Sequence, residues 1–130
     1  MNQEQKRNPI KLLLVDDEEA YVNVLANRMA KRSIEVTKAL SGTEGIQALR
    51  RVDFDVPILD LKMEEVDGIE VLKVFKKMVP SMPVIMLTGH GSEKAARDGL
   101  ELGASRYLTK PCDLEELMEK IKEAIRSVRS

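Results

Sequence analysis

Five polar residues with complementary chemistry stand at the ends of apolar runs of strand length in this chain. Asp16 and Asp17 follow LLLV, Asp60 follows VPIL, Thr88 follows VIML and Lys110 follows YLT. Neighbouring carboxylates repel one another when ionised, so a cluster of them favours a bound cation. Mg²⁺ prefers hard oxygen ligands of this kind and also binds phosphoryl oxygens.

The same residue types suit phosphoryl transfer. That reaction needs a nucleophile in line, a metal ion and a positive group for the developing charge. Asp60, Mg²⁺ and Lys110 could fill these roles, since carboxylates accept phosphoryl groups as aspartyl phosphates. Taken alone, each residue has an ordinary explanation: an acidic pair before a helix usually compensates the helix dipole, and a lone lysine is usually a surface residue. Only joint placement would favour the chemistry.

The elements between these residues predict such a placement. Apolar runs of strand length occur at 12–15, 34–39, 56–59, 84–87 and 107–108, and helical patterns occur at about 18–31, 41–51, 68–78, from about 92, and at 113–128. Strict alternation of strand and helix predicts a parallel sheet with helices on both faces, a doubly wound, flavodoxin-like (βα)5 fold of the α/β class. The ligand site of such a sheet lies at the carboxyl ends of the strands, where these polar residues stand.

Composition limits the function classes. With 130 residues, the chain has the length of one domain, which we expect at 10–130 behind a flexible tail at 1–9. Its 21 positive and 22 negative residues nearly cancel, so direct nucleic-acid binding is not expected. No apolar run approaches the roughly 20 residues that span a bilayer. The single cysteine, Cys112, and the polar start MNQEQKRNPI favour the cytoplasm over secretion.

Four motifs, in order, resemble those of response-regulator receiver domains of two-component signalling. They are LLLVDDE, ILDLKM followed by VDG, VIMLTG and YLTKP, and the resemblance extends from about residue 10 to 126. It implies a sheet with strand order 2-1-3-4-5. It also implies a signalling domain that catalyses only its own phosphorylation and dephosphorylation, not an enzyme with a separate substrate.

The resemblance assigns ligands for Mg²⁺. By this likeness Asp17 is a direct metal ligand and Asp16 acts largely through water. Asp60 is both ligand and phosphoacceptor, and the backbone carbonyl of Lys62 completes the protein ligands.

A second group of residues matches the family's switch. Thr88 corresponds to the hydroxyl that moves to bond the phosphoryl group, Lys110 to the cation that pairs with it, and Tyr107 to the aromatic that turns inward. The face formed by the fourth helix, fifth strand and fifth helix would then change, and could carry a homodimer. The implied partners are a sensor histidine kinase or phosphotransfer protein, and a downstream effector protein or an effector domain not included in this chain. The Lys110–Pro111 bond is commonly cis in the family.

Three departures from the family pattern stand out. Pro57 lies inside a central strand, where its missing N–H predicts a bulge or local irregularity. Glu64 and Glu65 replace the usual proline of the acceptor loop, which predicts a looser, more negative loop. His90 lines the approach to the phosphoryl group and, with Glu64, is a candidate modulator, although an exposed histidine without a role is the simpler interpretation.

Two other function classes are weighed against the phosphorylated switch. A pseudo-receiver would keep the fold and bind partners independently of phosphate, and the intact acidic and basic residues argue against it. A flavin carrier would need phosphate-binding hydroxyls or main-chain donors after the first strand, where Asp16, Asp17 and Glu18 would repel an anion. Visible absorbance of the purified protein would separate the last class from the others.

Overall fold

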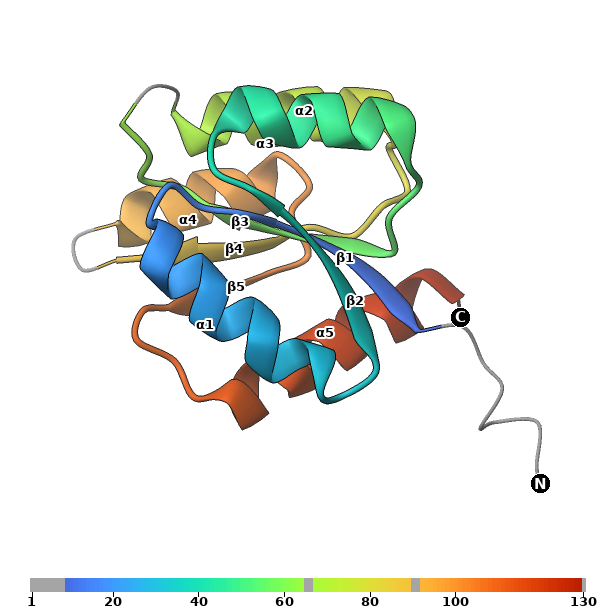
Figure 1. Ribbon diagram of the computed structural model, residues 1–130. Coiled ribbons are helices and arrows are strands. Elements are labelled where there is room, and N and C mark those ends of the chain that lie inside the picture. The colour runs from blue at the N-terminus through green and yellow to red at the C-terminus, as the bar shows by residue number, and fades with distance from the viewer. Residues whose placement is uncertain (1–8, 65–66, 90–91, 130) are drawn as a thin grey trace.

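A computed structural model of the chain describes residues 9–64, 67–89 and 92–129. Strands and helices alternate through it (Figure 1): β1 (Ile10–Val15), α1 (Glu19–Ala30), β2 (Ile34–Ala39), α2 (Gly42–Arg51), β3 (Val56–Asp60), α3 (Gly68–Met78), β4 (Ile85–Thr88), α4 (Glu93–Glu101), β5 (Arg106–Thr109) and α5 (Leu114–Arg129). The predicted α/β class and (βα)5 order are confirmed. All but one residue of the tail predicted at 1–9 lies outside the described residues.

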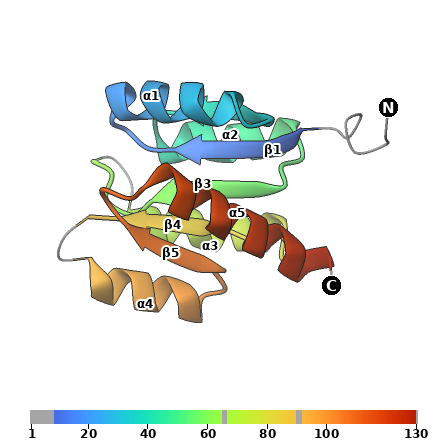
Figure 2. The ribbon, with the colours of Figure 1, turned by 90° about the horizontal axis from the view of Figure 1, so that it is seen from below.

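The five strands form one parallel sheet in the order β2-β1-β3-β4-β5, as the family resemblance implied. Helices cover both of its faces: α2 and α3 lie above the sheet in Figure 1, and α1 and α5 lie below it. The view from below in Figure 2 shows α5 in front of the strands, α1 beside β1 and α4 beside β5. A polypeptide of this topology brings every strand's carboxyl end to one edge.

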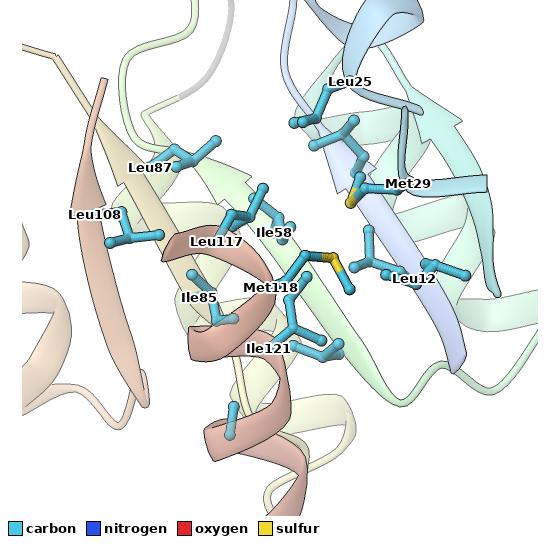
Figure 3. Close-up of a cluster of buried hydrophobic side chains, with 14 of the residues drawn as sticks. Leu12, Leu25, Met29, Ile58, Ile85, Leu87, Leu108, Leu117, Met118 and Ile121 are labelled. Carbon is cyan, nitrogen blue, oxygen red and sulfur yellow. The ribbon is translucent and has the colours of Figure 1, made fainter. Parts of the chain in front are cut away.

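Alternate residues of β1 supply the two halves of the core. Leu12 and Leu14 face α1 and α5, while Leu13 and Val15 face α2, α3 and α4, as the two-residue period of a strand requires. Figure 3 shows the first half, in which Leu25 and Met29 of α1 and Leu117, Met118 and Ile121 of α5 meet Leu12, Ile58, Ile85, Leu87 and Leu108 of the strands. The four β1 residues from Leu12 to Val15 are fully buried.

Strand ends differ slightly from the hydrophobic runs that predicted them. β1 begins two residues before its apolar run, because the backbone of Lys11 pairs with that of Glu35 although the Lys11 side chain is exposed. β5 likewise extends one residue beyond its predicted run at each end. Backbone pairing sets the limits of a strand, whereas an apolar run marks only the part that is covered.

The bulge predicted at Pro57 is absent. The register between β1 and β3 passes through Leu13↔Pro57 without a shift. Pairing with β4 begins only at Ile58, so Pro57 has a neighbouring strand on one side alone. Just before it, the Asp55 N–H donates to the Lys11 carbonyl at 2.8 Å and holds the start of the strand in place. An interior residue points its N–H toward one neighbour, so a single missing donor does not force a shift of register.

Helix starts follow from local sequence. The Ser41 hydroxyl accepts the Glu44 N–H at 3.1 Å. The Glu44 carboxylate reaches back to accept the Leu40 N–H at 2.9 Å, one residue before the N-cap, which is a variant of the reciprocal capping box. Asp67 caps α3 in a similar way by accepting the Ile69 N–H. Within the described ranges, none of the helices is both long and apolar enough to cross a membrane.

Candidate functional site

Three carboxylates meet at the carboxyl edge of the sheet. Asp60 is the last residue of β3, and Asp16 and Asp17 directly follow β1, the neighbouring strand. One oxygen from each of the three lies within 4.8 Å of the others. Asp16 and Asp60 are buried, with 0% and 3% of their surface exposed. The placement expected from the strand ends is therefore present.

Two of these carboxylates are oriented by the backbone that follows them. Asp16 Oδ1 accepts the Glu18 N–H at 2.9 Å, and Asp60 Oδ1 accepts the Lys62 N–H at 3.0 Å. A bond from an aspartate to the N–H two residues ahead closes a short turn and fixes the side chain. In both residues the other oxygen, Oδ2, is the one that faces Lys110.

The third carboxylate is tied to the loop that follows β3. The backbone N–H of Glu64 donates to Asp17 Oδ2 at 3.0 Å. Proline has no N–H and could not make this bond, so the departure at position 64 adds a contact between the two loops. The Glu64 side chain is exposed. Glu65 lies outside the described residues, and the predicted looseness of the loop stays a prediction.

Lys110 brings a positive charge to the cluster from the end of β5. Its Nζ lies 2.6 Å from Asp16 Oδ2, 3.1 Å from Glu18 Oε1 and 3.5 Å from Asp60 Oδ2. The ammonium also lies 4.6 Å from the centroid of the Tyr21 ring. Only 16% of the Lys110 side chain is exposed. The lysine is therefore held by groups from two other parts of the chain, the segment from β1 into α1 and the end of β3.

Burial and charge oppose one another at this site. Burial raises the pKa of Asp60 from 3.8 to about 6, and the negative charge of Asp16 adds to the rise, while the Lys62 N–H and Lys110 lower it. Burial alone would lower the pKa of Lys110, but its hydrogen bond to Asp16 and the charges of Asp16 and Asp60 raise it above the ordinary value. Lys110 thus stays charged and offsets part of the acidic cluster.

Thr88 and Tyr107 lie on the neighbouring strands β4 and β5. The Thr88 side chain is buried, and its hydroxyl donates to the Leu108 carbonyl at 3.3 Å. Tyr107 is 38% exposed. The Lys110 N–H donates to the Thr88 carbonyl at 2.6 Å, which continues the pairing of the two strands up to the site. The Lys110–Pro111 bond is cis.

Gly68 is a site-supporting residue whose role the sequence motif alone did not reveal. A Cβ built there would lie 2.5 Å from Leu61 Cα and 2.6 Å from the Asp60 carbonyl oxygen. The Gly68 N–H donates to the Leu61 carbonyl at 3.2 Å. The first turn of α3 therefore packs directly on the backbone of Asp60 and Leu61, and only glycine leaves the space.

The contacts of Glu18 and Tyr21 with Lys110 were also missed. Tyr21 lies in a segment for which the sequence predicts a helix, but a helical pattern gives no sign of a contact with a lysine 89 positions later in the chain. Glu18 adjoins the acidic pair, and this adjacency was the available signal. His90 lies outside the described residues, so its predicted place near the site is not assessed.

Comparison with known proteins decides the family. A family match over residues 12–122 is described as the response regulator receiver domain. The chain belongs to this family. Receiver domains are the signalling domains of two-component response regulators, and the acidic cluster at the sheet edge is one that could hold a metal ion. The motif resemblance and the strand order implied by it are confirmed.

Relatives and solved structures agree with this assignment. The transcriptional regulatory protein GlrR of Escherichia coli (strain K12) is 39% identical over 117 residues, which cover 90% of this chain and 26% of that protein. A response regulator receiver domain protein from Clostridium thermocellum superposes with a TM-score of 0.89 at 34% identity, covering 92% of this chain and 97% of that one. A receiver domain protein described as CheY-like from Methanospirillum hungatei JF-1 gives a TM-score of 0.88 at 30% identity, covering 93% and 97%.

The receiver domain spans about a quarter of the length of the first curated relatives that it matches. These relatives are transcriptional regulatory proteins.

Proposed function

We propose that this receiver domain accepts a phosphoryl group on the Asp60 carboxylate in a Mg²⁺-dependent reaction. The donor is a phosphohistidine of a sensor histidine kinase or phosphotransfer protein, or a small phosphodonor such as acetyl phosphate, in the cytoplasm. A carboxylate oxygen of Asp60 forms a bond to phosphorus while the bond from phosphorus to the donor breaks, and the donor leaves with that electron pair.

The observation that carries the proposal is the position of Lys110 between two buried carboxylates from different strands. Its ammonium contacts Asp16 at 2.6 Å and Asp60 at 3.5 Å. The ammonium lies closer to Asp16 than to Asp60, the proposed acceptor. It is therefore near Asp60 but forms its shortest ion pair with the other carboxylate. A cation in this place can pair with a phosphoryl oxygen once Asp60 carries the new group.

The donor set fits Mg²⁺. Asp16, Asp17 and Asp60 offer three hard oxygen ligands within 4.8 Å of one another, and the backbone carbonyl of Lys62 is the fourth group that the family resemblance implies. Repulsion from Asp16 contributes to the raised pKa of Asp60, and a cation would relieve it. When bound, Mg²⁺ supplies positive charge shared between these carboxylates and the phosphoryl oxygens.

The proposed switch starts from the contacts of Thr88 and Tyr107. Phosphorylation adds charge and acceptor oxygens. The Thr88 hydroxyl, now bonded to the Leu108 carbonyl, turns to the phosphoryl group, and Tyr107 turns inward from its exposed position. The face of α4, β5 and α5 would then bind a downstream effector or a second copy of the domain. The transcriptional regulatory protein GlrR is matched over only 26% of its length, which supports a receiver domain that acts together with an effector domain.

Phosphorylation can be tested with acetyl phosphate and with beryllofluoride, a phosphoryl analogue, in the presence of Mg²⁺. We expect a Mg²⁺-dependent gain of one phosphoryl mass and a shift of amide resonances, both lost in Asp60→Asn. Asp55→Asn is a matched control, because Asp55 stands just before the other end of β3, where its carboxylate accepts the Lys11 N–H at 2.9 Å. This control should react like the wild type.

A folded wild-type protein that shows neither adduct nor spectral change would refute the proposal. The same holds if Asp60→Asn still acquires the phosphoryl mass. The first outcome would leave the phosphate-independent binding module, the pseudo-receiver, as the leading function.

A further inference from the structure

We propose that Tyr21 is a positioning residue for Lys110, and that its ring face holds the ammonium where it can reach the phosphoryl group on Asp60. This inference rests on the proposed function and adds a residue to it. The carrying observation is the 4.6 Å distance between Lys110 Nζ and the centroid of the Tyr21 ring. At this distance the negative face of an aromatic ring attracts a cation.

Lys110 needs more than its carboxylates to have a defined position. Lysine carries a point charge on a flexible four-carbon chain. One of its three carboxylate partners, Glu18, has a side chain that is 65% exposed and so gives weak restraint. The other two, Asp16 and Asp60, belong to the acidic cluster that would also serve Mg²⁺. The Tyr21 ring contacts the ammonium without carrying a charge, and it would bind neither Mg²⁺ nor the phosphoryl group.

Tyr21 can act as a fixed surface because the fold holds it. It is the third residue of α1, and its side chain packs against the buried cluster beneath α1 and α5. Cys112 and Leu114, which follow Lys110 in the chain, pack against the same cluster. The ring and the chain segment that carries Lys110 therefore share one support, so the distance between them is set by the core.

The ring also keeps water from one side of the ammonium. The Lys110 side chain is 16% exposed and Tyr21 is half-buried. A cation–π contact is stronger when the cation is partly desolvated. If Tyr21 had only a structural role, its substitution would lower the free energy of unfolding but would leave the phosphorylation rate unchanged.

The test compares Tyr21→Phe, which keeps the ring face, with Tyr21→Leu, which keeps apolar packing and removes the face. We expect Tyr21→Leu to slow phosphorylation by acetyl phosphate, and to weaken beryllofluoride binding, by roughly three- to thirtyfold, the range for a partly to largely desolvated cation–π contact. Tyr21→Phe should retain the wild-type rate and affinity. The Lys110 ε-methylene protons should show an upfield ring-current shift in wild type and Tyr21→Phe, and lose it in Tyr21→Leu.

Urea unfolding of each variant separates positioning from stability. A Leu variant that loses stability but keeps the wild-type rate, affinity and Lys110 resonance would overturn the proposal, and so would a Phe variant as slow as the Leu variant. If the Leu variant does not unfold cooperatively, Tyr21→Met takes its place with the same expectations. Asp60→Asn is combined with each Tyr21 variant to test the two proposals separately. If a double variant still gains the phosphoryl mass, Asp60 is not the acceptor, and this conclusion does not depend on the role of Tyr21.

Discussion

Gly68→Ala should damage both stability and the candidate site, because the space for a methyl group is occupied by backbone. The new Cβ would lie 2.5 Å from Leu61 Cα, 2.6 Å from the Asp60 carbonyl oxygen and 2.9 Å from the Leu61 carbonyl oxygen. None of these atoms can turn aside as a side chain would. Relief requires the first turn of α3 to move away from the residue that we propose as acceptor.

The size of the effect follows from two opposed terms. Overpacking a filled site costs about 1–3 kcal/mol, and more where the neighbours cannot move. Alanine recovers at most about 1 kcal/mol of helix propensity over glycine, and less at the first helical position, where Gly68 lies. Because all three neighbouring atoms are backbone, the cost lies at or above the upper end of this range, and we expect a net loss of about 2–3 kcal/mol in the free energy of unfolding. With a urea m value on the order of 1.5 kcal/mol/M, the midpoint would fall by about 1.3–2 M.

Gly99→Ala is the matched control. A Cβ at Gly99 would overlap the Met86 thioether, which is a side chain. Met86→Ala should therefore reduce the cost of Gly99→Ala in a double-mutant cycle, but it should leave the cost of Gly68→Ala unchanged. Equilibrium urea unfolding of the three single and two double variants measures these terms. A Gly68→Ala midpoint within about 0.3 M of the wild type would refute the backbone-contact reasoning.

Two further predictions concern charge and capping. The pKa of Asp60 lies near 6 in the folded chain and at 3.8 for an unburied aspartate, so the folded state binds this proton more tightly and stability falls as pH rises from about 4 to about 6. Without Mg²⁺, Asp60→Asn should be more stable than wild type at pH 7 by up to about 3 kcal/mol. Urea midpoints should show this advantage shrinking as pH falls toward 4, and a gap independent of pH would contradict it. Ser41→Ala removes the hydroxyl that accepts the Glu44 N–H and should cost about 1 kcal/mol. Ser81→Ala, in an exposed turn before β4, is its control, and equal midpoints for the two would show that the cap contributes nothing.

The sequence predicted what depends on local pattern and on topology. Alternating strand and helix patterns lead to a parallel sheet, and a parallel sheet brings the ends of its strands to one edge. The meeting of Asp16, Asp17 and Asp60 with Lys110 could therefore be expected before any coordinates. The helix start expected near residue 41 was likewise predictable, because the cap formed by Ser41 and Glu44 depends only on residues within about one turn.

Contacts that depend on the third dimension were not predictable in this way. The Tyr21 ring lies beneath Lys110 because α1 and the segment after β5 rest on the same core, and no local pattern encodes that meeting. Of the bulge or local irregularity predicted at Pro57, the bulge does not form, because the sequence shows a missing N–H but not where pairing with the next strand begins. β4 begins its pairing one residue later, at Ile58, so Pro57 is flanked by β1 alone.

The ion pair between Lys110 and Asp16 joins positions 94 residues apart in the chain. Lys110 follows β5, which lies at the edge of the sheet, so this contact exists only while β5 is paired with β4. A partly folded intermediate lacking β5 would still have three carboxylates near one another but no lysine among them. Competence to accept a phosphoryl group would therefore arise together with complete folding, and the donor would act on finished domains and pass over unfinished ones.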